Sequence, residues 1–171
     1  MDKIHSVDFG GLSVEISADA GTARYTFVGD IAESLDPSLL TVVDRDETIF
    51  DLEGIRSVNS CGVRTWVGIV RDFSSRTHLV FDKCSVSIVD QFNLVPQTLG
   101  HASIASFYAP YYCSTCDEEV TVLLRADTYQ SELAEGTAPK IRHNCGTNLE
   151  FDALEDTYFQ QLREPTKKQA G

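Results

Sequence analysis

Apolar and polar positions alternate along the chain in blocks that predict a strand, a long helix, a second strand and a second helix. The first strand covers residues 48–52, and the second is the apolar run at 78–81. Between them, one helical face gathers Val63, Trp66, Val67, Val70 and Phe73. A short amphipathic helix is expected at 85–94. The polar stretch between the first strand and the long helix, residues 57–62, therefore forms the turn that starts this helix.

That turn, Ser57-Val58-Asn59-Ser60-Cys61-Gly62, places Ser60 at or near the helix N-cap. A serine at such a position ordinarily accepts a hydrogen bond from a backbone amide and caps the helix. The same hydroxyl can also carry a phosphate, because the helix dipole and the free amides of the first turn tolerate negative charge. The residues of the turn leave both roles open.

The order of elements around this turn resembles the STAS domain, the family of anti-sigma-factor antagonists and sulphate-transporter cytoplasmic domains. Besides the elements above, the matching segments are a strand at 23–28, a turn at 29–31, a helix at 36–43 and a last strand at 104–107. The resemblance covers residues 1–108. It implies an α/β fold in which helices cover one side of a mixed sheet.

Members of this family that act as switches carry Asp, then Ser or Thr, a small residue and Gly at this turn, and a partner kinase phosphorylates the hydroxyl. Ser60 matches the acceptor and Gly62 the glycine, whereas Asn59 replaces the usual Asp. The resemblance implies a non-enzymatic regulatory module that binds a serine-kinase anti-sigma factor or a signalling kinase. The expected contact residues are Asn59, Ser60, Cys61, Gly62 and Arg64, and phosphorylation of Ser60 would release the partner.

The charge balance excludes some partners. The chain has 14 basic and 26 acidic residues and a formal net charge of −12, which repels nucleic acids and anionic lipid surfaces. No stretch approaches the ~20 consecutive apolar residues of a membrane helix, and no signal sequence is evident. We therefore expect a cytoplasmic protein without membrane insertion. Its five cysteines, an odd number, favour reduced thiols or a metal site over a disulfide framework.

The second part of the chain, residues 109–163, is similar to a zinc ribbon. A Cys-x-x-Cys turn, a strand at 120–124, a loop at 131–139, a second thiol turn and a strand at 148–151 follow one another. Zinc ribbons hold the ion with four thiolate or imidazole ligands in a tetrahedron. Here the ribbon is degenerate, because only its first turn has both cysteines.

The candidate metal ligands are Cys113, Cys116, His143 and Cys145. Arg142 stands where the second turn would carry its other cysteine, and His143, two residues before Cys145, is the nearest substitute. This spacing is tighter than in a standard zinc knuckle. Two alternatives therefore remain open. Either the ribbon binds zinc, or it has lost its metal and is held by the packing of Tyr111, Tyr112, Val122 and Phe151.

Two further functions remain as alternatives. The chain can be a structural adaptor in a multiprotein signalling or transport assembly, without a phosphoswitch. The segment 107–116 is also similar to the active-site approach of thioredoxin-type oxidoreductases, in which Cys113 and Cys116 would be the reactive pair. In those enzymes the thiols open a helix that lowers the pKa of the first cysteine, whereas the residues after Cys116 favour a strand.

The end of the chain predicts a short helix and a flexible tail. Leu154, Tyr158 and Leu162 recur at helical spacing, so a helix within 155–163 is expected to pack against the ribbon. Residues 164–171 are polar and expected to be frayed. No catalytic constellation is evident along the sequence. The leading interpretation therefore predicts a protein without enzyme activity of its own.

Overall fold

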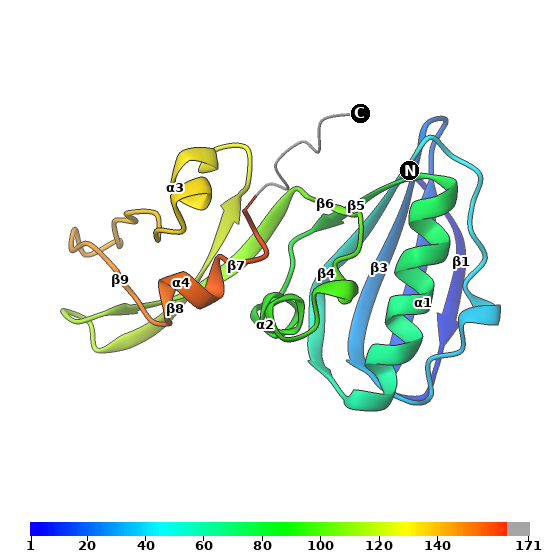
Figure 1. The fold of residues 1–171 in the computed structure, drawn as a ribbon, viewed down its shortest axis with the longest axis horizontal. Helices are drawn as coiled ribbons and strands as arrows, with labels where there is room; N and C mark the ends of the chain where they lie inside the picture. Colours follow the sequence, from blue (N-terminus) through cyan, green and yellow to red (C-terminus); the bar gives the residue numbers. More distant parts are fainter. Residues whose placement is uncertain (164–171) are drawn as a thin grey trace.

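The computed structural model describes residues 1–163 and shows two β-sheets joined side by side (Figure 1). The tail expected at 164–171 lies outside these residues. The larger sheet has six strands, in the order β1 (Asp2–Asp8), β2 (Leu12–Ala18), β3 (Thr22–Ile31), β4 (Glu47–Val58), β5 (His78–Asp82) and β6 (Ser103–Ile104). Strands β1 to β3 pair antiparallel and β3 to β6 pair parallel. The fold is therefore α/β with a mixed sheet, as expected.

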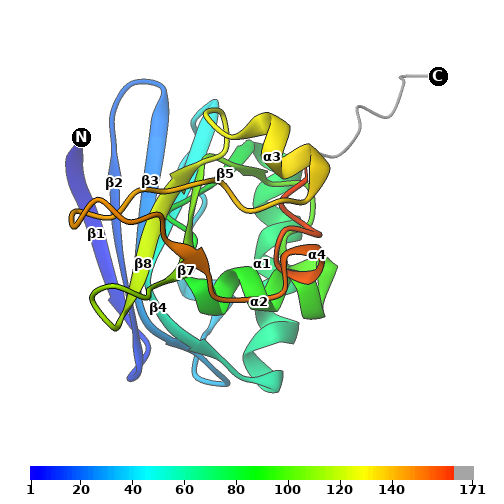
Figure 2. The same cartoon turned by 90° about the vertical axis from the view of Figure 1, so that its left-hand side faces the viewer.

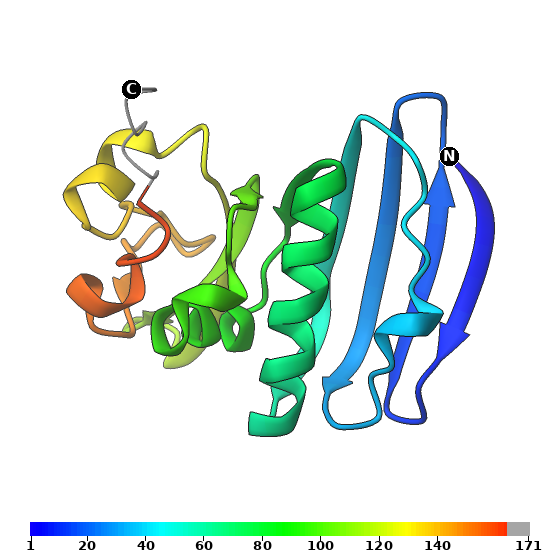
Figure 3. The same cartoon turned by 45° about the vertical axis from the view of Figure 1, so that its right-hand side comes forward.

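Two helices cover one face of the six-stranded sheet (Figures 1 and 3). They are α1 (Ser60–Arg76) and α2 (Val86–Leu94). The ring of Phe81 in β5 lies 6.0 Å from Trp66 of α1 and 5.6 Å from Phe92 of α2, so both helices pack on the same side of this strand. Trp66 also contacts Phe50 of β4, and its indole N–H donates to the carbonyl of Thr98 over 3.0 Å. Buried aromatic rings thus form the centre of the core.

The other face of the larger sheet carries paired charges. Arg24 of β3 lies 3.0 Å from a carboxylate oxygen of Asp51 and 3.2 Å from one of Asp82. Lys83 reaches Asp51 over 3.5 Å and Glu53 over 3.0 Å. Asp51 is only 7% exposed, so its ion pairs compensate for the loss of hydration. These neighbouring strands are therefore linked by ion pairs on one face and by aromatic packing on the other.

The smaller sheet has three antiparallel strands in the order β8 (Glu118–Arg125), β7 (Ser106–Cys113) and β9 (Glu150–Phe151), beside α3 (Gln130–Glu135) and α4 (Glu155–Tyr158) (Figure 2). Helix α4 packs against α2, because Asn93 donates to the carbonyl of Tyr158 over 3.0 Å. The Tyr158 hydroxyl donates to the carbonyl of Tyr108 in β7. Buried residues of both sheets belong to one hydrophobic cluster, and β7 runs through the boundary expected at residue 108.

Several strands differ from the expected ones. Strands β1 and β2 were not predicted, although Leu12, Val14 and Ile16 alternate with polar residues. The last strand expected at 104–107 is divided, because β6 pairs with β5 whereas β7 joins the second sheet. The loop expected at 131–139 contains part of helix α3, and β9 is shorter than the strand expected at 148–151.

The prediction of a helix at 36–43 is wrong. Only the 3₁₀ turn η1 (Pro37–Leu39) forms there, and the following residues have no regular structure. The buried Tyr25 explains this, because its hydroxyl donates to the carbonyl of Thr41 over 2.6 Å and accepts from the amide of Val43 over 2.9 Å. A side chain from β3 thereby occupies the Val43 amide, which a helix over 36–43 would have paired with the carbonyl of Leu39.

The C-terminal helix is also shorter than expected. Helix α4 ends at Tyr158, and the chain continues in turns through Arg163. Tyr158 and Leu162 are buried as predicted, whereas Leu154 is 77% exposed. The helical spacing therefore identified two of the three packing residues.

Candidate partner-binding turn and candidate metal centre

The turn before α1 is capped by Asn59. Its backbone is extended, with φ −93° and ψ 168°, and its side-chain oxygen accepts from the amide of Gly62 over 2.8 Å. Ser60 is therefore the first helical residue and not the N-cap, and its side chain is exposed. Because Asn59 supplies the cap, the helix does not depend on the Ser60 hydroxyl for it.

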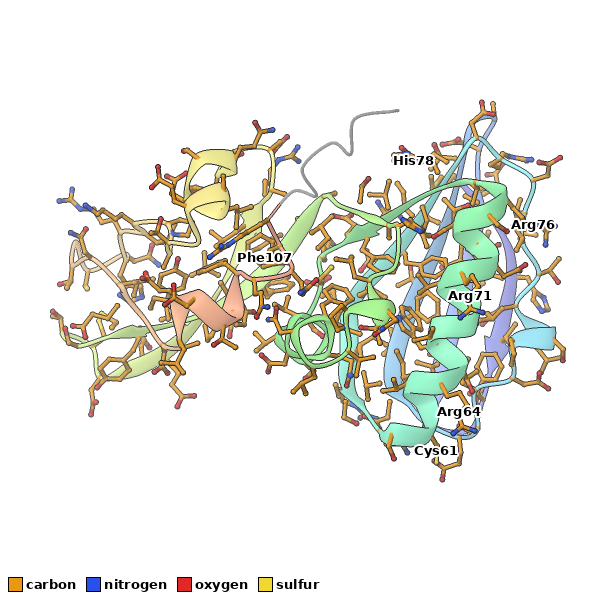
Figure 4. The ribbon with its side chains drawn as sticks, viewed as in Figure 1. Cys61, Arg64, Arg71, Arg76, His78 and Phe107 are labelled. Atoms are coloured by element: carbon orange, nitrogen blue, oxygen red, sulfur yellow. The ribbon has the colours of Figure 1, made fainter. Side chains whose placement is uncertain are left out.

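Gly62 is required by close packing between α1 and the end of β3. A Cβ atom at this position would lie 2.4 Å from the carbonyl oxygen of Ile31, and the amide of Asn59 donates to the same oxygen over 3.0 Å. Gly62 is buried and offers no side chain to a partner. The other predicted contact residues, Asn59, Ser60, Cys61 and Arg64, are exposed, and Figure 4 shows Cys61 and Arg64 at this end of the helix.

Two carboxylates that the sequence did not single out lie beside this turn. Glu33 accepts from the side-chain amide of Asn59 over 2.8 Å, and this hydrogen bond lowers the pKa of Glu33. Asp30 accepts from the hydroxyl of Ser57 over 2.9 Å and from Arg56 over 2.7 Å, which lowers the pKa of Asp30. Asp30 is thus paired with Arg56, whereas Glu33 is bonded to the uncharged Asn59 and keeps a negative charge beside the turn.

The four predicted metal residues come together at the far end of the second sheet. Cys113 ends β7, Cys116 lies in the turn to β8, and His143 and Cys145 lie in the turn that precedes β9. All four ligand atoms lie within 4.8 Å of one another. The sulfurs of Cys113 and Cys145 are 3.6 Å apart, and Nδ1 of His143 lies 3.6 Å from the sulfur of Cys116 and 3.3 Å from that of Cys145.

These separations suit a tetrahedral ion. Zinc bound at about 2.3 Å from sulfur and about 2.0–2.1 Å from nitrogen would place two sulfurs about 3.8 Å apart, and a sulfur and a nitrogen about 3.6 Å apart. The sulfur–sulfur distance of 3.6 Å is also far longer than a disulfide bond, and all five cysteines are free thiols. The cluster can therefore hold a metal ion.

The second thiol turn aims His143 into the cluster despite the short spacing to Cys145. The amide of His143 donates to the carbonyl of Thr147 over 2.8 Å, and Gly146 closes the turn with φ +87°, a conformation that favours glycine. The hydroxyls of Thr115 and Thr147 lie 2.7 Å apart and join the two turns. Arg142, which replaces the expected cysteine, instead forms an isolated antiparallel β-bridge with Asn148 through the backbone.

The pKa values of two thiols in the cluster, those of Cys145 and Cys116, are shifted in opposite directions. Hydrogen bonds from the side chain and the amide of Thr147, together with His143, lower the pKa of Cys145 to about 6. Hydrogen bonding to the sulfurs of Cys145 and Cys113 raises the pKa of Cys116 to about 12. The surroundings of Cys145 thus favour its thiolate, which is the form that binds metals.

The thioredoxin-type arrangement differs from this geometry. In such enzymes the helix that follows the first cysteine lowers its pKa. Here Cys113 is the buried last residue of β7, and the turn that contains Cys116 leads into strand β8. The pair therefore lacks the helix terminus that would activate a thiol.

Comparison with known proteins adds no relative: no protein-family model and no curated protein matches this chain. The helices within residues 1–163 include none long and apolar enough to span a membrane.

Proposed function

We propose that this chain is a non-enzymatic protein-binding module of the anti-sigma-factor antagonist type. It binds a serine-kinase anti-sigma factor or a related signalling kinase through residues 59–64. The observation that carries this proposal is the exposed Ser60 at the first position of a 17-residue helix, beside a backbone held by Asn59 and Gly62. The succession β3, β4, α1, β5 and α2 supports the STAS resemblance, although the helix expected at 36–43 is replaced by η1.

Phosphorylation of Ser60 regulates binding in this proposal. A phosphate adds a charge of about −1.5 to −2, which the N-terminus of α1 tolerates because its amides and dipole favour anions. Glu33, whose pKa is lowered by its hydrogen bond from Asn59, already places a negative charge beside the turn, whereas the charge of Asp30 is paired with Arg56. The modified turn therefore repels a partner that approaches it, while the fold persists.

The intact mass of the protein from the cells that produce it tests this mechanism. We expect a fraction of the molecules to be heavier by one phosphate, and fragmentation to place the phosphate on Ser60. If Ser60 carries no phosphate under any growth condition tested, the phosphoswitch is contradicted. The alternative, a structural adaptor in a signalling or transport assembly, would then be favoured.

We further propose that Cys113, Cys116, His143 and Cys145 bind zinc as a structural site. The sulfur and nitrogen distances around the cluster support this choice of metal and geometry. Four protein ligands leave no open coordination position, so the ion would stabilise the second sheet without catalysis. When bound, zinc supplies four bonds that join the two turns.

Apolar packing contributes to the same region and would persist without metal. Tyr111 is buried and its ring lies 5.4 Å from that of Phe151, whereas Tyr112 and Val122 are only partly buried. The proposed role of zinc is therefore to order the two turns beyond this packing. A thiol oxidoreductase remains the lesser alternative, and slow alkylation of Cys113 at neutral pH would count against it.

A further inference from the structure

The two nitrogens of the His143 imidazole have different surroundings. Nδ1 faces the sulfurs of Cys116 and Cys145 at 3.6 and 3.3 Å. Nε2 faces away from the cluster and lies 3.2 Å from a carboxylate oxygen of Glu118. The His143 side chain is 15% exposed and that of Glu118 is 52% exposed, so the ring is enclosed whereas the carboxylate meets solvent.

A neutral imidazole can bind a metal through only one nitrogen, because the other carries the proton. In metal sites this second nitrogen commonly donates to a carboxylate, which fixes the tautomer and the orientation of the ring. We propose that His143 binds the metal through Nδ1 and that Glu118 is a positioning residue whose carboxylate accepts a hydrogen bond from the Nε2–H group. This inference rests on the zinc site proposed above and adds a residue outside the four predicted ligands.

The pairing of β7 with β8 positions Glu118. Glu118 is the first residue of β8 and lies directly opposite Cys113, whereas the next residue, Glu119, lies opposite Tyr112. Successive side chains of a strand point to opposite faces, so only one of these two glutamates can face the cluster. The backbone ladder therefore places Glu118 on the same face of the sheet as Cys113, independently of the second thiol turn.

This contact has a specific use in a degenerate ribbon. A standard knuckle orients both ligands through the backbone between two cysteines, whereas here His143 stands two residues before Cys145. The ring of a histidine must rotate into place about its side-chain bonds. A carboxylate behind Nε2 selects the rotation in which Nδ1 points to the sulfurs, and so replaces the missing backbone constraint.

Matched substitutions in the full-length chain test this inference. We expect Glu118→Ala to weaken zinc binding by about 10- to 100-fold, the usual effect of losing such a partner, in competition with a chromogenic chelator. Glu119→Ala removes the same charge from the adjacent strand position and should bind zinc like the wild type. Glu118→Gln should lie between them, because its amide oxygen can still accept a hydrogen bond from Nε2–H. Equal zinc affinity of Glu118→Ala and Glu119→Ala would overturn the role of Glu118.

Nitrogen NMR of zinc-loaded wild-type protein identifies the ligating atom. The expected spectrum of His143 shows a metal-bound Nδ1 and a protonated Nε2. A metal-bound Nε2 in a protein that does bind zinc would overturn this inference alone. A wild-type chain that binds no zinc would overturn the proposed zinc site together with it, so the two failures are distinguishable.

Discussion

At the scale of single residues, the four side chains of the candidate metal site make the sharpest prediction. Cys145→Ser should abolish stoichiometric zinc binding, because it removes one of the four ligands and the sulfur that lies nearest to His143. Cys61→Ser is the matched control, since Cys61 is also an exposed thiol but lies at the start of α1. Metal analysis of the purified proteins should find one zinc per chain in the wild type and in Cys61→Ser only.

Removal of the metal from the wild type should lower the stability of the fold. A strong chelator is expected to lower the melting temperature of the wild type and of Cys61→Ser, because binding to the folded state adds to its stability. The chelator should leave the melting temperature of Cys145→Ser unchanged. Identical chelator effects on Cys61→Ser and Cys145→Ser would contradict a site at this cluster.

The sequence allowed the four candidate metal ligands to be identified but not their surroundings. Cys113 and Cys116 were found because their spacing is a local signal, and His143 because it stands near Cys145. Glu118 and Glu33 could not be found in this way, since the contacts of Glu118 with His143 and of Glu33 with Asn59 join residues far apart in the chain. Such contacts follow from strand pairing and helix placement, which short motifs do not describe.

At the scale of elements, two glycines of α1 separate packing from helix propensity. Gly62→Ala should destabilise the fold by about 1–3 kcal/mol, because the new methyl group would overlap the carbonyl of Ile31. Gly68→Ala, on the same helix but with no atom within 4 Å of the new Cβ, should stabilise the fold by about 1 kcal/mol. Urea unfolding of both variants measures the two effects. A stabilising Gly62→Ala would contradict the close approach of α1 to β3.

The elements also show where local pattern fails. The long helix was predicted well, because Trp66, Val70 and Phe73 form a buried stripe. The helix expected at 36–43 did not form, because the hydroxyl of Tyr25 binds the backbone of residues 41 and 43. The sequence also could not predict that the last strand is divided between two sheets. Ile104 and Phe107 are both apolar strand residues, and they differ only in that the first pairs with β5 and the second with β8.

At the scale of the whole molecule, Glu53 links the two sheets in a pH-dependent manner. Glu53 of β4 accepts from the hydroxyl of Tyr108 in β7, and this hydrogen bond, with that of Lys83, lowers the pKa of Glu53. The stabilisation of the folded state by ionised Glu53 is present above the unfolded pKa of about 4.3, and it is lost as the pH falls through the lower pKa of the folded state. Tyr108→Phe should therefore destabilise the protein at pH 7 and have a smaller effect at pH 3.

A second tyrosine separates the contact between the sheets from a tyrosine–carboxylate hydrogen bond within one sheet. The hydroxyl of Tyr112 donates to Asp117 within the β7–β8 turn, so Tyr112→Phe leaves the contact between the sheets intact. Chemical denaturation of each variant beside the wild type cancels the effects of acid on the rest of the protein. If the loss in Tyr108→Phe is the same at both pH values, ionised Glu53 does not join the sheets.

The central claim, that residues 59–64 bind a partner under the control of Ser60, is tested most directly by parallel affinity purification from native cells. The baits are the wild type, Ser60→Asp, and Ser131→Asp, which places the same charge in the first turn of α3. We predict that the wild type and Ser131→Asp retain one kinase-type protein, identified by mass spectrometry, and that Ser60→Asp loses it with an unchanged melting temperature. Retention of the same proteins by all three baits would contradict the claim.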